Sequence, residues 1–221
     1  MLMSTGETAA ALDVSVQRVQ AMLSDGRFVA QKVGSQWVID STSIATARRS
    51  GRAMTERNAW ALIKLSDGVK TNGLRAEENY RLRARLGRLV GSGDSTAVLL
   101  RSWLANRAER VLLSASETSA LLEDARVTHS GISDPKSGIA AHGEAEGYVK
   151  REDLASLVRD HALFRSEAGN SNVVLHVTEG RRVKDAAPLL LVAADLADYG
   201  TEREVGQAEL LVSRIGESLR G

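Results

Sequence analysis

The sequence predicts an α+β protein with an N-terminal winged helix-turn-helix, a helical middle segment and a C-terminal mixed α/β domain. Residues 4–39 hold two short helical patterns joined by a turn, followed by an alternation typical of a β-hairpin. Beyond residue 110, short runs of β-branched residues alternate with helical patterns. We therefore expect four parts, which are a winged unit over 1–47, a basic linker over 48–54, an arginine-rich helical segment over 55–108 and an α/β domain over 109–221.

Capping residues predict the first two helices. Ser4 precedes Glu7 by three residues, which is the spacing of a capping box, so a helix begins there and continues to Leu12. After the turn over 13–15, the hydroxyl of Ser15 is expected to cap a second helix, which Gly26 ends. One face of this second helix is apolar and carries Val16, Val19, Met22 and Leu23.

A β-hairpin is expected next. Residues 28–33 and 36–39 alternate between apolar and polar side chains, and the pair Gly34-Ser35 suits a two-residue turn between them. Asp40 or Ser41 then caps a third short helix that continues to Ile44. A helix-turn-helix commonly places its second helix in the major groove of DNA, so double-stranded DNA is the expected partner of this unit.

The spacing of this unit resembles that of the excisionase-like and MerR-like winged helix-turn-helix family. The matching segments are 8–12, 14–15, Val19, 26–27, 33–34 and 37–39. The resemblance implies that the second helix enters the major groove and that the wing contacts the neighbouring backbone or minor groove. The residues that it assigns to the DNA surface are Ser15, Gln17, Arg18 and Ala21 on the helix, and Lys32, Ser35 and Gln36 on the wing.

These side chains suit two kinds of contact. Gln17 and Arg18 can offer hydrogen bonds to base edges, and Lys32 can contact a phosphate. One alternative interpretation is that they are ordinary solvated side chains. Another is that the helix-turn-helix binds protein instead of DNA. Three further arginines, Arg48, Arg49 and Arg52, lie in the linker, where they either follow the DNA backbone or are simply solvated.

Charge is divided between the two halves of the chain. Residues 1–113 hold 17 lysines and arginines against 10 aspartates and glutamates, and residues 114–221 hold 12 against 18. A basic half suits a phosphate partner. The acidic half does not, so we expect it to contact protein, and the two halves have different partners. The alternative is an ordinary drift of surface charge along the chain.

The middle segment is predicted to contain three helices. The first begins at Thr55 and ends near 67–68, the second covers 74–90, and the third begins at Ser95. The second is strongly basic. Its apolar stripe is Tyr80, Leu82, Leu86, Leu89 and Val90, which leaves Arg81, Arg85 and Arg88 near the opposite side. This basic side either extends the DNA footprint or binds an acidic protein surface.

The C-terminal domain mixes short strands with helices. Strands are expected over 111–113, 127–131, 147–149 and 172–177. Helices are expected over 116–124, 151–161, 187–199 and 202–219, with Gly200 between the last two. Loops fill 134–138 and 140–143.

Catalytic motifs are absent from the sequence. There is no cysteine, no histidine pair at metal-ligand spacing and no glycine-rich phosphate loop, so we expect no enzyme activity, metal or cofactor. Asp160 and His161 are adjacent on a predicted helix, so their side chains are expected to diverge. A nuclease is the sharpest enzymatic alternative, because carboxylates and a lysine gather over 144–153. The simpler interpretation is that these residues form a solvated edge and the N-terminus of a helix, where acidic residues are common.

The expected location is the cytoplasm. The chain has neither a segment of roughly 20 apolar residues that would span a membrane nor the charged start and apolar core of a signal peptide. We therefore expect no membrane partner.

The C-terminal half resembles antitoxins of the AbiEi type. The similar segments are 122–131, 172–177, 187–189, 194–196 and 199–204. The resemblance implies a regulator that represses its own operon and neutralises a nucleotidyltransferase toxin through its C-terminal domain. Two other functions stay open, a DNA-directed nuclease-like enzyme and a ligand-sensing repressor.

Overall fold

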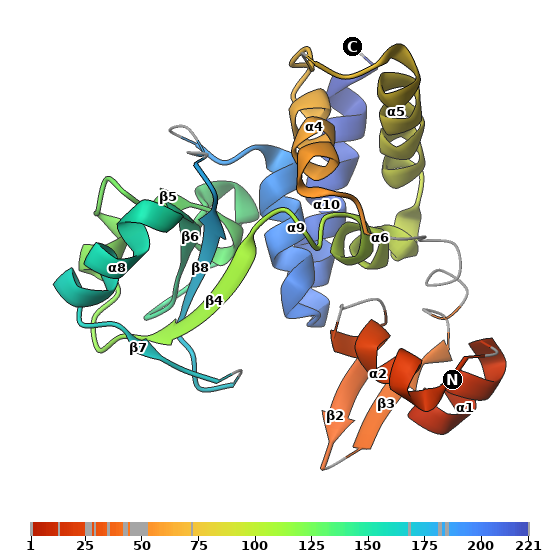
Figure 1. The fold of residues 1–221 in the computed structure, drawn as a ribbon, viewed down its shortest axis with the longest axis horizontal. Helices are drawn as coiled ribbons and strands as arrows, with labels where there is room; N and C mark the ends of the chain where they lie inside the picture. The colour runs from red at the N-terminus through yellow and green to blue at the C-terminus, as the bar shows by residue number, and fades with distance from the viewer. Residues whose placement is uncertain are drawn as a thin grey trace.

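The computed structural model describes residues 2–220 except 13, 25–27, 29, 35, 42–43, 45–52, 72, 168, 181–182 and 184–185. It is a mixed helix and sheet protein, as the sequence predicts. Figure 1 shows a small N-terminal unit below a bundle of helices, with a second sheet beside the bundle. Among the helices of the described residues, none is both long and apolar enough to cross a membrane.

The N-terminal unit contains two helices and a three-stranded antiparallel sheet. Its elements are β1 (Leu2–Ser4), α1 (Thr5–Leu12), α2 (Val16–Ser24), β2 (Ala30–Val33) and β3 (Gln36–Asp40), and the strand order is β1-β3-β2. The expected hairpin is confirmed, since Val33 pairs with Gln36. Strand β1 was not predicted. It is only three residues long, and it forms because Leu2 to Ser4 pair with the far edge of β3.

Both predicted helix caps are present. The backbone N–H of Ser4 donates to Oε2 of Glu7 at 2.7 Å, and the N–H of Glu7 donates to Oγ of Ser4 at 3.2 Å, which completes the capping box. The Oγ of Ser15 accepts the N–H of Arg18 at 3.2 Å. These bonds satisfy N–H groups that have no partner within the helix.

The core of this unit confirms most of the predicted apolar stripe. Val19 and Met22 are buried with Phe28 and Ile39, and Leu23 packs against them. Val16 was wrongly assigned to this core, because it lies in the first turn of α2 and is 43% exposed.

The helix predicted to begin at Asp40 or Ser41 and to continue to Ile44 lies partly outside the described residues, which exclude 42–43. Gly26, the predicted end of α2, and the linker arginines are also outside them.

Five helices form the bundle. They are α4 (Glu56–Ser66), α5 (Ala76–Val90), α6 (Thr96–Trp103), α9 (Leu189–Tyr199) and α10 (Glu202–Ser218). Helix α9 contacts α4, α6 and α10, and all five helices contribute to one apolar core. The predicted helical segment and the end of the predicted C-terminal domain therefore share a core, and Figure 1 shows α9 and α10 beside α4, α5 and α6.

The stripe of α5 differs from the prediction. Leu82, Leu86 and Leu89 are buried, but Tyr80 is 76% exposed. Tyr80 precedes Leu82 by two residues, which places it about 200° around the helix and on the outer side.

Two arginines of α5 also differ from the prediction. The guanidinium groups of Arg85 and Arg88 lie over the ring of the buried Trp103, at 5.6 and 5.3 Å from its centroid, instead of pointing away from the bundle.

The second sheet has five strands. They are β4 (Glu109–Ser114), β5 (Thr128–His129), β6 (Ala145–Lys150), β7 (Phe164–Arg165) and β8 (Val173–Thr178), in the order β5-β6-β8-β4-β7. Among the described strands of this sheet, β6 and β8 pair in parallel and the other pairs are antiparallel. The predicted helix over 116–124 is reduced to α7 (Ser119–Leu122), and β7 was not predicted.

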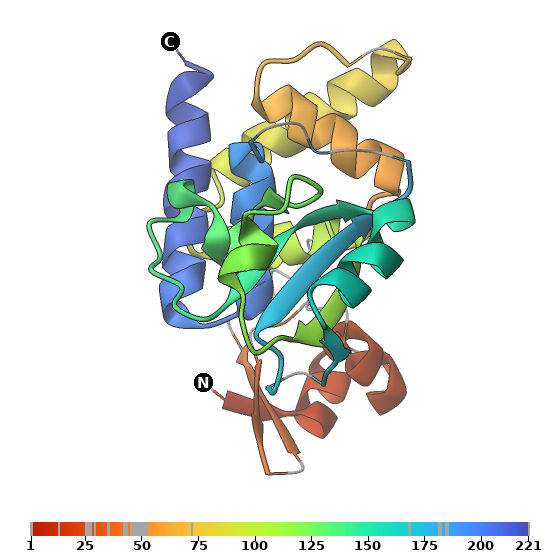
Figure 2. The ribbon, with the colours of Figure 1, turned by 90° about the vertical axis from the view of Figure 1, so that its left-hand side faces the viewer.

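The two faces of this sheet pack against different layers. Val149 of β6 and Leu175 of β8 pack with Leu157 of α8 (Arg151–Asp160). Successive side chains of a strand point to opposite faces, so Tyr148 and His176 point towards the bundle. Figures 1 and 2 show α8 on one side of the sheet and α9 on the other. The sheet is therefore a middle layer, and its bundle-facing side carries polar residues.

An ion-pair cluster holds the end of α8. Nη1 of Arg126 lies 2.9 Å from Oδ2 of Asp160, and Nη2 lies 2.6 Å from Oδ2 of Asp124. His161 Nε2 is 2.9 Å from the same Asp124 oxygen, so Asp160 and His161 converge on one cluster instead of diverging. The hydrogen bonds from Arg126 keep the pKa of Asp124 well below its ordinary value.

Candidate functional site

The predicted DNA-contacting residues of α2 are exposed along one side of the helix. Ser15, Gln17, Arg18 and Ala21 are all exposed. Gln17 and Ala21 are four residues apart and therefore lie one above the other, opposite the buried Val19. Ser15 is at the start of this side, where its hydroxyl caps the helix. Together these residues form a continuous solvent-facing surface.

The hairpin presents its two described candidates on opposite faces. Lys32 pairs with Trp37, and these two side chains share the sheet face of Ile39, which packs against α2. Gln36 pairs with Val33, so it lies on the other face. Lys32 is therefore on the same side of the sheet as α2, and Gln36 is not. The remaining candidates, Ser35, Arg48, Arg49 and Arg52, are outside the described residues.

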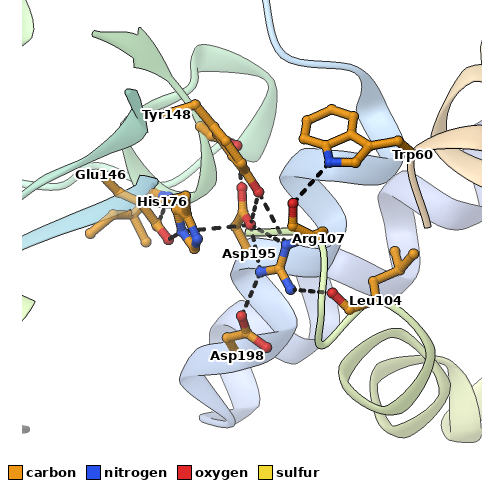
Figure 3. A network of polar contacts seen from close by, with 10 residues as sticks. Trp60, Leu104, Arg107, Glu146, Tyr148, His176, Asp195 and Asp198 are labelled. Carbon is orange, nitrogen blue, oxygen red and sulfur yellow. Dashed lines mark hydrogen bonds and ion pairs between the residues drawn. The ribbon is translucent and has the colours of Figure 1, made fainter. Parts of the chain in front are cut away.

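A buried polar network lies between the bundle and the second sheet (Figure 3). Its centre is Arg107, in the segment between α6 and β4, which is 3% exposed. Nε and Nη2 of Arg107 donate to Oδ1 of Asp195 at 2.9 and 2.6 Å, and Nη2 also donates to Asp198 at 2.5 Å. The third nitrogen, Nη1, donates to the carbonyl of Leu104 at 3.1 Å. All three guanidinium nitrogens therefore have partners.

Residues of the sheet complete this network. The hydroxyl of Tyr148 donates to Oδ1 of Asp195 at 2.9 Å, and the Tyr148 ring stacks on His176 with 4.8 Å between centroids. Nε2 of His176 lies 2.7 Å from Oε1 of Glu146. From α4, the indole N–H of Trp60 donates to the carbonyl of Arg107 at 2.8 Å. The network thus connects α4, β6, β8 and α9 around one buried cation.

The charges of this network support one another. Burial disfavours the charged form of Arg107, but the negative charges of Asp198 and Asp195 raise its pKa well above the ordinary value. Burial and the neighbouring Asp195 also raise the pKa of Tyr148, so its hydroxyl stays protonated and can donate. Burial opposes ionisation of Asp198, yet Arg107 lowers its pKa overall. Arg107 is therefore a buried cation paired with two carboxylates.

Glu146, His176 and Asp195 are close enough together to hold a metal ion. Their oxygens already have protein partners. Asp195 accepts from Arg107, Tyr148 and Ser130, and Oε2 of Glu146 accepts the N–H of Ile132 at 3.0 Å. A cation there would compete with Arg107 for Asp195. The arrangement suits a structural network better than a catalytic metal centre.

The acidic residues that suggested a nuclease do not converge. Lys150 lies 2.9 Å from Glu152, and Glu144 and Glu152 are exposed. Glu146 was wrongly assigned to a solvated edge. It belongs to β6, which is flanked by β5 and β8, and it is 1% exposed.

The sequence did not indicate that Arg107, His176 and Asp195 form a group. The alternation of Glu146 and Tyr148 along one strand face is the signal that could have indicated a polar inner layer.

A pocket of about 390 Å³ lies beside this network. The segment 105–108 and the residues Arg101, Arg110, His176 and Asp198 line it from the body of the protein. Leu23 and Ser24, at the end of α2, line it from the N-terminal unit. The pocket therefore lies where the unit with the predicted DNA surface meets the bundle.

The comparisons with known proteins returned no match. No protein-family model, no curated protein and no solved structure is similar to this chain.

Proposed function

We propose that this protein is a sequence-specific DNA-binding transcriptional regulator that reads duplex DNA with α2. The observation that carries the proposal is the exposed surface of Gln17, Arg18 and Ala21 on a helix capped by Ser15. Gln and Arg side chains have the donors that read base edges in the major groove. In this proposal the N-terminal unit acts as a winged helix-turn-helix, with α2 as the recognition helix and the β2–β3 hairpin as the wing.

The position of Lys32 supports a wing contact. Lys32 is exposed and lies on the sheet face that packs against α2, so one DNA duplex can meet both. Its ammonium group suits a phosphate oxygen, which would position the protein without reading sequence. The linker arginines would add further phosphate contacts.

Binding is tested by selecting duplexes from a random library and measuring the affinity of the enriched sequence by fluorescence anisotropy. Replacing Arg18 by Ala is expected to weaken binding to the enriched duplex by about 1–3 kcal/mol, with less effect on unrelated duplexes. Replacing Lys32 by Ala is expected to weaken binding to all duplexes alike and to reduce the salt dependence.

Matched controls sharpen this test. Gln31→Ala changes the neighbouring residue of β2, whose side chain points to the other sheet face, and it is expected to leave affinity unchanged. Arg83→Ala removes an exposed arginine of α5 and tests whether that basic helix belongs to the footprint. The proposal fails if Arg18→Ala and Lys32→Ala both bind as the parent does.

The proposed biological role is that of an autoregulating antitoxin that neutralises a nucleotidyltransferase toxin. The excess of acidic residues over 114–221 supports a protein partner for this half. The test is the chromosomal neighbourhood, where a nucleotidyltransferase-like reading frame should lie beside this gene. Co-expression should then relieve the toxicity of its product. Continued toxicity under co-expression contradicts the role.

A further inference from the structure

We propose that the pocket beside the buried network binds a small anion through its phosphate group, with Arg101 as the residue that holds it. The pocket has about 390 Å³, which is within the usual range for small-ligand sites. This inference goes beyond DNA binding and does not depend on it.

Arg101 is an arginine with unused donors. It lies on α6 and is only 6% exposed. Its Nη1 donates to the carbonyl of Ala197 at 3.0 Å, near the end of α9. Its Nε and Nη2 are buried, and within the part of the chain that the structure describes they have no hydrogen-bond partner. Buried charged donors without partners are costly, so this side chain suits a ligand that supplies acceptors.

The two free nitrogens define the chemistry of that ligand. Nε and Nη2 lie on one edge of the planar guanidinium, from which their N–H groups point in parallel. Two oxygens of a phosphate or carboxylate group can accept both bonds at once. The same edge of Arg107 already binds the carboxylate of Asp195 in this structure.

The other charged residues of the pocket favour an anion. Among the lining residues of the described chain, three are arginines, namely Arg101, Arg107 and Arg110, and Asp198 is the one carboxylate. Asp198 is 2.5 Å from Arg107 and is therefore already compensated. Arg110 is exposed, and its guanidinium lies 5.8 Å from the centroid of the Tyr199 ring. Arg101 and Arg110 can thus both face the ligand, which favours a doubly charged phosphate group over a singly charged carboxylate.

A bound anion would also touch the N-terminal unit. Leu23 and Ser24 line the pocket at the end of α2, so a ligand there contacts both parts of the protein. If α2 reads DNA, occupancy of the pocket would change DNA affinity. That consequence rests on the proposed function, whereas binding itself is measured without DNA.

The test uses isothermal titration calorimetry and thermal unfolding of the full chain with inorganic phosphate and with pyrophosphate. Acetate and citrate are the carboxylate probes. We expect saturable binding of a phosphate probe and a rise in the unfolding temperature with its concentration. Arg101→Met should weaken binding about tenfold or more, because it removes two charge-assisted hydrogen bonds. Arg101→Lys should also weaken it, since lysine keeps the charge but lacks the paired donors.

Two further variants keep the test decisive. Arg83→Met changes an exposed arginine of α5 that is not among the residues lining the pocket, and it is expected to bind phosphate as the parent does. Arg110→Met changes an exposed lining residue, so it tests the site even if the Arg101 variants fold poorly. The proposal is overturned if neither phosphate probe binds at millimolar concentration, or if only the carboxylates bind. It is also overturned if Arg101→Met binds phosphate as the parent does. Should Arg101→Met misfold, the same result for Arg110→Met overturns it.

Discussion

Replacing Asp195 by Ala is expected to reduce the free energy of unfolding by about 3–5 kcal/mol. Asp195 is fully buried and accepts two hydrogen bonds from Arg107, one from Tyr148 and one from Ser130. Without it, Arg107 stays buried with Asp198 as its remaining carboxylate partner. A buried ion pair is not necessarily a large net gain over an apolar pair, but removing Asp195 leaves Arg107 with one carboxylate instead of two and leaves the buried donors of Tyr148 and Ser130 without their acceptor.

Urea unfolding followed by circular dichroism measures this effect. Asp160→Ala is the matched control, because Asp160 also pairs with an arginine but its side chain is 53% exposed. Exposed ion pairs contribute about 0–1 kcal/mol. A loss below about 1 kcal/mol for Asp195→Ala would show that the Arg107 network does not hold the sheet to the bundle.

Replacing Gly131 by Ala is the other change with a large expected effect, about 3 kcal/mol of destabilisation. Gly131 has a φ of 52°, and a Cβ at this position would lie 1.7 Å from Oε2 of Glu146. Glu146 is buried and fixed by hydrogen bonds to Ile132 and His176, so its carboxylate cannot move aside without losing them. Both the backbone conformation and the space are therefore unsuitable for a side chain.

Gly180→Ala separates these two causes. Gly180 has a similar φ of 60°, but a Cβ there would meet no atom of the described residues within 4 Å. Its replacement should cost about 1–2 kcal/mol for the backbone conformation alone. Thermal unfolding of both variants gives the comparison. Equal losses of stability for the two variants would mean that the contact between the added Cβ at position 131 and Glu146 is unimportant.

Local patterns predicted the local structure well. The caps at Ser4 and Ser15 and the hairpin around Gly34 depend on residues that are neighbours in sequence, so spacing is sufficient to find them. The long helices of the bundle were found for the same reason. The three-residue strand β1 and the two-residue strand β7 were not, because such short strands form only when a partner strand is present.

The candidate sites between the helical bundle and the second sheet could not be predicted in this way. Arg107, Glu146, His176 and Asp195 lie far apart in the sequence and meet only when the bundle packs on the sheet. Arg85 illustrates the same limit, since a helical pattern cannot reveal that its guanidinium lies over Trp103 of another helix. The exposure of Gln17, Arg18 and Ala21 could be predicted, because the helical period of a single segment places them away from the buried Val19.

In the function proposed for this protein, α2 is the surface that binds DNA. Hydrogen exchange of the full chain, measured with and without the enriched duplex, is the direct test of that surface. We predict slower exchange in α2 (Val16–Ser24) and in the β2–β3 hairpin, with α8 (Arg151–Asp160) unchanged. Slower exchange confined to the arginine-rich α5 (Ala76–Val90), with α2 unaffected by DNA, would contradict the account.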